Sequence, residues 1–162
     1  MPDATPGIIA RYSLNDEQAV LARVRYNRLI DIFLGLSCYS LQNHLRTTVR
    51  DVGQIETDEL YVGLNKAGAH FVIPVQAKSG RDQLSRVQVE QDLALCAARF
   101  PNLLCRPIGV QMLDTGVIAL LEFVEQGLDI RIASERHYSL VPSDEISDVE
   151  LTQYRELSDD QH

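Results

Sequence analysis

Two strand-like runs of hydrophobic and polar residues, joined by a short turn, dominate the middle of the chain. The second run, from Phe71 to Lys78, has an apolar stretch at 72–75 followed by Gln76, and the first run, from Ile55 to Leu64, alternates hydrophobic and polar residues. Such alternation is typical of β-strands, because successive side chains of a strand point to opposite faces. Between the runs, residues 65–68 (Asn-Lys-Ala-Gly) are the types that favour a tight turn. The pattern predicts a β-hairpin.

Two other segments have the hydrophobic spacing of helices. The first is 16–34, where Ser13 or Asn15 is the expected N-cap. Its apolar positions recur about every three or four residues: Val20, Leu21, Val24, Leu29, Ile32 and Phe33. The second is 83–99, with Asp82 as the expected N-cap. We expect this helix to bury Leu84, Val87, Leu93, Leu95 and Cys96.

The alternating run 38–49 predicts a further strand, and the runs 103–113, 117–124 and 129–140 are also expected to be strands. The short connections 114–116 and 125–127 have turn residues, so the strands that they join are expected to be antiparallel neighbours. A weaker helical pattern covers 146–157, with Ser143 or Ser147 as its cap. The strand at 117–124 is apolar enough to be either core or a subunit interface.

The order of these elements is helix, three strands, helix, strands. The connection from 71–78 through a helix to 103–113 is long enough to join parallel strands, and such crossovers are right-handed. The first three strands are connected too tightly to be anything but antiparallel. We therefore expect an α/β fold with a mixed sheet flanked by helices. At 162 residues the chain is expected to form a single domain over 1–162.

The composition is that of a folded chain, since 45% of the residues are hydrophobic. No apolar run approaches the roughly 20 residues that a membrane span needs. The beginning of the chain lacks the basic and apolar regions of a secretory signal, and 1–12 is expected to be a loose arm. The three cysteines, Cys38, Cys96 and Cys105, are widely spaced. They predict buried free thiols in a reducing cytoplasm.

The net charge of −8 is unusual for a protein that binds nucleic acid. The charge is uneven along the chain, however. Residues 1–110 hold 12 Lys/Arg and 11 Asp/Glu, whereas residues 111–162 hold 3 and 12. Residues 1–110 are therefore near neutral in total charge. The two strand-like runs and the segments beside them supply six cations: Arg46, Arg50, Lys66, Lys78, Arg81 and Arg86. Strong non-specific DNA binding is not expected from this composition.

The predicted hairpin brings four polar residues together. Glu56 and Asp58 are two apart and share one face of the first strand, as Gln76 and Lys78 do on the second. Acidic oxygens suit a hard divalent cation such as magnesium. A lysine next to the ligands can orient or deprotonate an attacking water. These groups are suited to hydrolysis of a phosphodiester.

The order Asp58, then Gln76-Ala77-Lys78, then a helix bearing Gln88 resembles the PD-(D/E)-x-K, or restriction-endonuclease-like, nuclease superfamily. The resemblance covers about residues 16–113 and implies an αβββαβ core. Residues 114–162 would then be a C-terminal β extension with a short helix. The chain departs from the usual motif at Gln76, where most members carry an acid and some branches carry glutamine.

The resemblance implies a magnesium or manganese ion held by Asp58, Gln76 and the backbone carbonyl of Ala77. Glu56 is a further ligand candidate, because it would replace the charge that Gln76 lacks. Lys78 is the expected catalytic lysine. Three other residues are expected to contact substrate or to hold the lysine: Gln88, His44 and Arg46. Gln91 and Asp92 follow Gln88 at a spacing that puts them along the same helix face.

The expected function is therefore a metal-dependent endonuclease that acts on DNA, in the cytoplasm, and a homodimer is one way to cut both strands. The alternative is a non-catalytic module on the same fold that binds nucleic acid or a protein. A purely structural interaction domain is a third reading. Gln76 and the acidic segment 111–162 motivate these alternatives. No His-based zinc site, phosphate-binding glycine loop or Ser/His/Asp motif is found.

Overall fold

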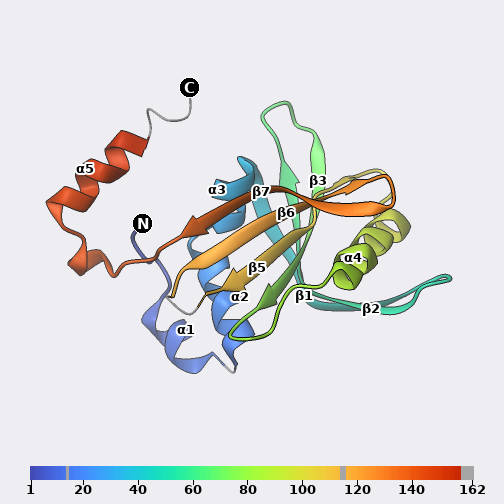
Figure 1. Ribbon diagram of the computed structural model, residues 1–162, viewed down its shortest axis with the longest axis horizontal. Coiled ribbons are helices and arrows are strands. Elements are labelled where there is room, and N and C mark those ends of the chain that lie inside the picture. The colour runs from blue at the N-terminus through green and yellow to red at the C-terminus, as the bar shows by residue number, and fades with distance from the viewer. Residues whose placement is uncertain (14, 114–115, 158–162) are drawn as a thin grey trace.

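The computed structural model describes residues 1–13, 15–113 and 116–157, which form an α/β structure around one mixed β-sheet (Figure 1). The strands along the sheet follow the order β1-β2-β3-β5-β6-β7, and the short β4 pairs with β3 beside β5. Their bounds are β1 Ser37–Val49, β2 Gly53–Leu64, β3 His70–Lys78, β4 Leu104–Cys105, β5 Ile108–Met112, β6 Ile118–Gln126 and β7 Asp129–Tyr138. As expected, β1, β2 and β3 are antiparallel, β3 and β5 are parallel, and β5, β6 and β7 are antiparallel.

Helices pack on both faces of the sheet. Their bounds are α1 Gly7–Tyr12, α2 Asp16–Tyr26, α3 Leu29–Leu34, α4 Arg86–Arg99 and α5 Asp148–Glu156. On one face, α2 and α3 bury their apolar side chains against β1, β2, β3, β5 and β6. On the other face, α4 packs over the hairpin of β1 and β2 and over β3, through a smaller core that contains Ile55, Leu60, Val72 and Leu95. Ile118 and Leu120 lie in the first of these cores, so that part of β6 is core.

The helix expected over 16–34 is wrong as a single helix. It breaks at Asn27 and Arg28, where Arg28 has a left-handed backbone with φ of 54°. The buried Asn27 side chain donates to the carbonyl of Arg23 and to the side chains of Asp3 and Thr5. A polar residue thus ends α2 and ties down the N-terminal arm. The arm itself is not loose, since it contains α1 and Pro2 bridges to Val141.

Helix α4 starts later than expected. Ser85, not Asp82, is its N-cap, and the Ser85 hydroxyl accepts a hydrogen bond from the backbone N–H of Gln88 at 3.2 Å. Residues 79–85 therefore form a loop between β3 and α4. The expected burial of Val87 is also wrong, because its side chain is 59% exposed. Val89 and Asp92 are buried instead, alongside the expected Leu95 and Cys96.

The strand expected over 103–113 is divided into β4 and β5 at Pro107. Proline has no N–H to give to a ladder, so it interrupts regular pairing. Arg106 still donates its backbone N–H to Val72, which keeps the two halves against β3. The turn expected at 114–116 lies mostly outside the described residues.

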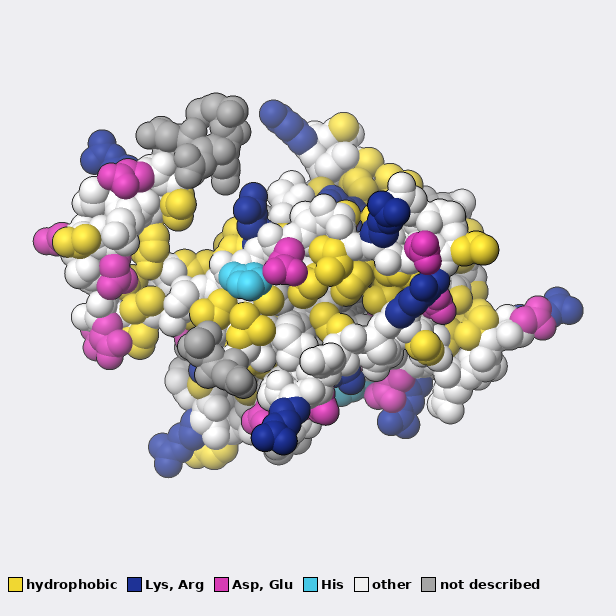
Figure 2. Space-filling view, viewed as in Figure 1, with side chains coloured by type: hydrophobic (Ala, Val, Ile, Leu, Met, Phe, Trp, Pro, Cys, Tyr) yellow, Lys and Arg dark blue, Asp and Glu magenta, His cyan; other side chains and the backbone are white. Residues whose placement is uncertain are grey.

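Within the acidic segment 111–162, β6 and β7 belong to the sheet, whereas helix α5 lies away from it (Figure 1). Figure 1 shows α5 standing apart from the sheet, and Figure 2 shows acidic side chains over it. Ser147 caps this helix, as expected for one of two alternatives, and none of its described residues is buried. Much of the excess negative charge is thus remote from α4 and β3. Across the described part of the chain, no helix has the length and apolarity needed to span a membrane.

Candidate functional site

The candidate site begins where β2 and β3 separate. Their register ends at the pair Glu59–Val75, and β2 then continues with only β1 beside it. At this point the Asp58 carboxylate accepts a hydrogen bond at 2.8 Å from the backbone N–H of Ala77. The Asp58 side chain thus replaces the next backbone hydrogen bond between β2 and β3. This contact holds the Asp58 carboxylate against β3, beside Lys78.

The separation also breaks the strict alternation that the sequence suggested for β2. Thr57 contacts Asp92 on α4, and Leu60, three residues later, belongs to the core beneath α4. Glu59 and Tyr61 face α2 instead. Side chains three apart share a strand face only where the backbone is irregular. This irregularity positions Asp58, which simple alternation could not do.

Asp92 on α4 is the centre of the buried part of the site. Its side chain is 1% exposed. The Thr57 hydroxyl donates to one carboxylate oxygen of Asp92 at 2.6 Å, and the Gln76 amide donates to both oxygens at 3.1 Å. A buried carboxylate with only neutral donors is costly to ionise. Asp92 therefore holds its charge poorly unless a cation joins it.

The pKa values of both aspartates reflect this shortage of positive charge. Burial raises the pKa of Asp92 to about 7, against the opposing hydrogen bonds from Thr57 and Gln76, and the charge of Asp58 raises it further. Burial also raises the pKa of Asp58, while the Ala77 N–H and the charges of Lys78 and His44 oppose that rise. The two carboxylates are thus electrostatic neighbours, with Lys78 close to Asp58. Pairs of acids arranged in this way are common at functional sites.

The hydrogen-bonding state of Gln88 provides an independent test of whether a hydrated divalent cation fits here. Gln88 lies one turn before Asp92 on the same face of α4. Its side-chain oxygen is buried, and among the described residues no donor reaches it. Buried acceptors normally have a partner, so this oxygen is suited to a water or an ion. Two carboxylates, two amide side chains and a backbone carbonyl are also the oxygen donors that magnesium prefers.

Glu56 lies further out than the sequence suggested. It is 45% exposed at its side chain and pairs with His44 at 3.8 Å and with Arg46 at 3.4 Å across the β1–β2 hairpin. The His44 ring also contacts the Gln18 amide on α2 at 2.6 Å. His44 and Arg46 thus lie together beside Glu56 at the β1–β2 hairpin. Glu56 contacts these two side chains, and its effect on Asp58 is electrostatic: in addition to burial, the negative charge of Glu56 raises the pKa of Asp58.

Glu59 is completely buried on the opposite face. It accepts hydrogen bonds at 2.8 Å from Arg25 on α2 and from Ser40 on β1. Its second carboxylate oxygen and the Tyr61 hydroxyl are buried, and neither has a hydrogen-bond partner within the described residues. This cluster joins α2 to the sheet and is separate from Asp58, Asp92 and Lys78.

Of the groups gathered around Asp58 and Asp92, the sequence drew attention to Asp58, Gln76, Ala77 and Lys78, and it also singled out Gln88, one turn before Asp92 on α4. It named Asp92 only as a residue on the helix face of Gln88. The i, i+4 spacing from Gln88 was the available signal, but it shows neither depth of burial nor a partner on β3. Among the described residues, no three His, Cys, Asp or Glu side chains are grouped as a metal site would require. Any ion here would therefore depend on amide and backbone oxygens as well as on the two aspartates.

Comparisons of this chain with protein-family models, with curated proteins and with solved structures find no match.

Proposed function

We propose that this protein is a divalent-metal-dependent nuclease that hydrolyses phosphodiester bonds in DNA, with a core of the restriction-endonuclease-like type. The observation that carries the proposal is the meeting of two carboxylates, Asp58 from β2 and Asp92 from α4, beside Lys78 and Gln76 of β3. The element order of helix, three strands, helix, strand supports the fold assignment.

The position of Asp92 bears on the departure from the superfamily motif. Gln76 stands where that motif usually has an acid, and its amide donates to the Asp92 carboxylate. The negative charge that β3 lacks is therefore supplied from α4, at a hydrogen-bond distance from Gln76. In the proposal Asp58 and Asp92 are the charged ligands, and the oxygens of Ala77 and Gln88 complete the set.

The reaction adds water to the phosphorus and breaks one P–O bond, and the leaving oxygen takes up a proton. A bound divalent ion would supply charge stabilisation for the phosphate and would lower the pKa of water. Lys78 lies beside Asp58 and orients the attacking water, or stabilises the developing negative charge. His44 and Arg46 hold the substrate phosphate, and Glu56 orients these two side chains.

The test is DNA cleavage by purified variants in the presence of magnesium or manganese. Asp58→Asn, Asp92→Asn and Lys78→Ala should each lower the rate by about a hundredfold or more. Glu90→Gln is the matched control for Asp92→Asn, because Glu90 is an exposed acid of α4 paired with Arg86. Supercoiled, linear and single-stranded DNA should all be offered. Wild-type protein that cuts none of them, or site variants that cut like the control, would refute the proposal.

A second candidate is a non-catalytic binding module on the same fold. The observation that favours it is the ion pair of Glu56 with Arg46, together with the contact of Glu56 with the His44 ring, which removes a third carboxylate from the site. Calorimetric titration with manganese separates the two functions. A nuclease should bind the ion and lose that binding in Asp58→Asn, whereas a module without a metal site should bind none.

A further inference from the structure

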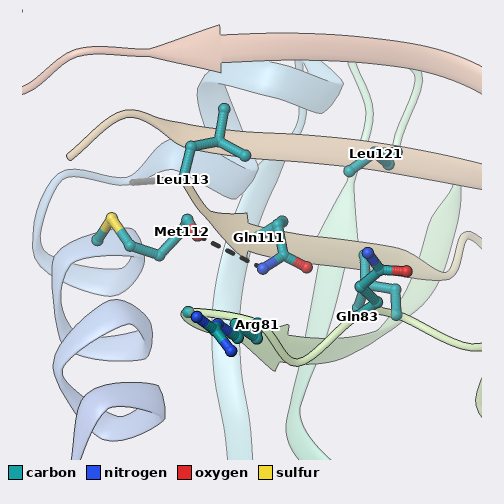
Figure 3. A pocket seen from close by; sticks show the side chains of 8 residues that line it. Arg81, Gln83, Gln111, Met112, Leu113 and Leu121 are labelled. Carbon is teal, nitrogen blue, oxygen red and sulfur yellow. Dashed lines mark hydrogen bonds between the residues drawn. The ribbon is translucent and has the colours of Figure 1, made fainter. Parts of the chain in front are cut away.

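An open pocket lies directly beside the candidate site, between the loop 79–85 and the strands β5 and β6 (Figure 3). Its volume is about 370 Å³. We call it the loop–sheet pocket, and it is lined by Gly80, Arg81, Gln83, Leu84, Gln111, Met112, Leu113 and Leu121. None of these residues belongs to the site described above.

Two features build the pocket. The Gln111 amide on β5 donates at 3.1 Å to the backbone carbonyl of Asp82, which fastens the loop to the sheet. Gly109, two residues before Gln111 on the same face, leaves room for Leu84 to pack down. A Cβ atom on Gly109 would lie 2.4 Å from the Leu84 side chain and 2.8 Å from the Phe123 ring. The loop is therefore held close to the sheet by a specific contact on each side.

The pocket is next to Lys78. In the parallel ladder of β3 and β5, Lys78 pairs with Gln111, so these two side chains project from the same face of adjacent strands. Adjacent strands are about 4.8 Å apart. A DNA strand whose phosphate lies at Lys78 would therefore have its neighbouring nucleotide over Gln111 and the pocket.

The lining has the chemistry that a nucleobase requires. Leu84 and Leu121 provide apolar surface for a face of a flat ring. Figure 3 shows the amides of Gln83 and Gln111 between the loop and the sheet. The Gln83 amide can donate to or accept from the ring edge. The Gln111 NH2 group already donates to the carbonyls of Asp82 and Met112, so its side-chain oxygen is the group that can accept from the base. The Arg81 guanidinium on the loop is exposed and suits an adjoining phosphate or the face of a base.

The position of the pocket also favours an unpaired base over a base that is paired in a duplex. A base inside a duplex is stacked and paired, and it enters a side pocket only after leaving the stack, which costs a few kcal/mol. An unpaired base has no such penalty, and apolar or cationic contacts to its face are the usual means of binding single strands.

We propose that the loop–sheet pocket binds an unpaired nucleotide of a DNA strand, the one next to the phosphate at Lys78. The inference rests on the proposed nuclease function and narrows its substrate to single-stranded or frayed DNA. Arg81 contacts the phosphate of the bound nucleotide, and Gln83 and Gln111 contact its base.

The test is binding without cleavage, measured by fluorescence anisotropy with a labelled single-stranded oligonucleotide and a blunt duplex of the same sequence, in EDTA. Arg81→Ala and Gln83→Glu should each weaken single-strand binding about tenfold. Arg50→Ala, which removes an exposed arginine at the β1–β2 turn, is the matched control and should bind as the wild type does. Thermal unfolding checks that all variants fold.

Three results would overturn the inference: no binding of the single strand by the wild type, equal binding by the Arg81, Gln83 and Arg50 variants, or duplex binding as tight as single-strand binding. Because EDTA removes catalysis, these results are separate from the nuclease assay. A protein that cuts DNA but shows no dependence on Arg81 would retain the proposed function without the pocket. Single-strand binding that depends on Arg81, in a protein that never cuts DNA, would refute the nuclease and not the pocket.

Discussion

The Gln76 amide on β3 donates to both carboxylate oxygens of Asp92 on α4, at 3.1 Å. The pair connects the middle of the sheet to the helix packed over it, beneath the surface. The Gln76 amide donates to the Asp92 carboxylate, whereas an ionised acid at position 76, the residue type usual in the nuclease motif, could not donate and would repel an ionised Asp92. Residue 76 is therefore matched to the acid on the helix.

Gln76→Glu tests this match. It would restore the usual acid of the nuclease motif but place it against Asp92, so the variant should be less stable than the wild type in EDTA by about 1–3 kcal/mol. Magnesium or manganese should reverse most of that loss, because a cation bound by both carboxylates neutralises their mutual repulsion. Urea unfolding with and without the ion measures both effects. Gln54→Glu, at an exposed position of β2, is the control, and equal losses in the two variants would show that no such match exists.

The raised pKa of Asp92 predicts how stability changes with pH. Its folded-state pKa is about 7, against an ordinary value of 3.8, so the folded state keeps a proton that the unfolded state loses between these values. Stability should therefore fall as the pH rises from about 4 to about 7, with a total contribution of about 4 kcal/mol from this group.

Urea unfolding across this pH range measures the effect, and Asp92→Asn should remove most of it. If Asp92 is a metal ligand, magnesium should stabilise the wild type more at about pH 8 than at about pH 5, because the ion competes with the proton. An unfolding free energy that is independent of both pH and residue 92 would contradict the assignment.

The buried ion pair between Arg25 and Glu59 should be a major link between α2 and the sheet. The Glu59 side chain is 0% exposed and that of Arg25 is 33% exposed. Arg25→Ala leaves the carboxylate buried with Ser40 as its hydrogen-bond donor, so it should cost about 3 kcal/mol in chemical unfolding. Arg46→Ala breaks the exposed pair with Glu56 and should cost less than about 1 kcal/mol. Similar losses in the two variants would mean that burial of Glu59 contributes nothing.

The start of α4 is tested by its two cap candidates. Ser85→Ala removes the hydroxyl that accepts from the Gln88 N–H and should destabilise the protein by about 1 kcal/mol. Asp82→Ala should change stability by less than about 0.5 kcal/mol, because the hydrogen bonds of Asp82, to Ser79 and from Gln111, are made by its backbone, which the substitution keeps. Thermal unfolding of both variants decides this, and the reverse order would place the helix start at Gln83.

Local sequence pattern was sufficient for much of the fold. The two strand-like runs and the turn residues between them placed the hairpin of β2 and β3 within two residues of its observed bounds, and the spacing of helix and strand predicted which neighbours are parallel. These properties depend on the two-residue period of a strand and on the length of chain needed to cross over a sheet. Both properties can be predicted from the sequence without knowing which segments pack against each other.

Where the prediction was wrong, the local sequence is compatible with more than one structure. Asp82 and Ser85 are both good caps, and tertiary packing selected Ser85, since residues 79–85 are used to reach Gln111 and cover Gly109. The helical pattern of 16–34 is continuous in hydrophobicity, yet the Asn27 side chain finds partners in the N-terminal arm and ends α2 there.

The candidate site likewise combines residues that the sequence predicted with one that only the tertiary structure identified. From the sequence alone, Asp58, Gln76 and Lys78 could be placed on a common hairpin, because covalent neighbours and a short turn bring them together. Only the tertiary structure brought in Asp92, 16 residues after Gln76, because its burial and its hydrogen bonds exist only after α4 has packed on β3. A helix face can be read from a period of 3.6, but its partner on the sheet depends on the rotation and height at which the two surfaces meet, and those are set by the packing of both cores together.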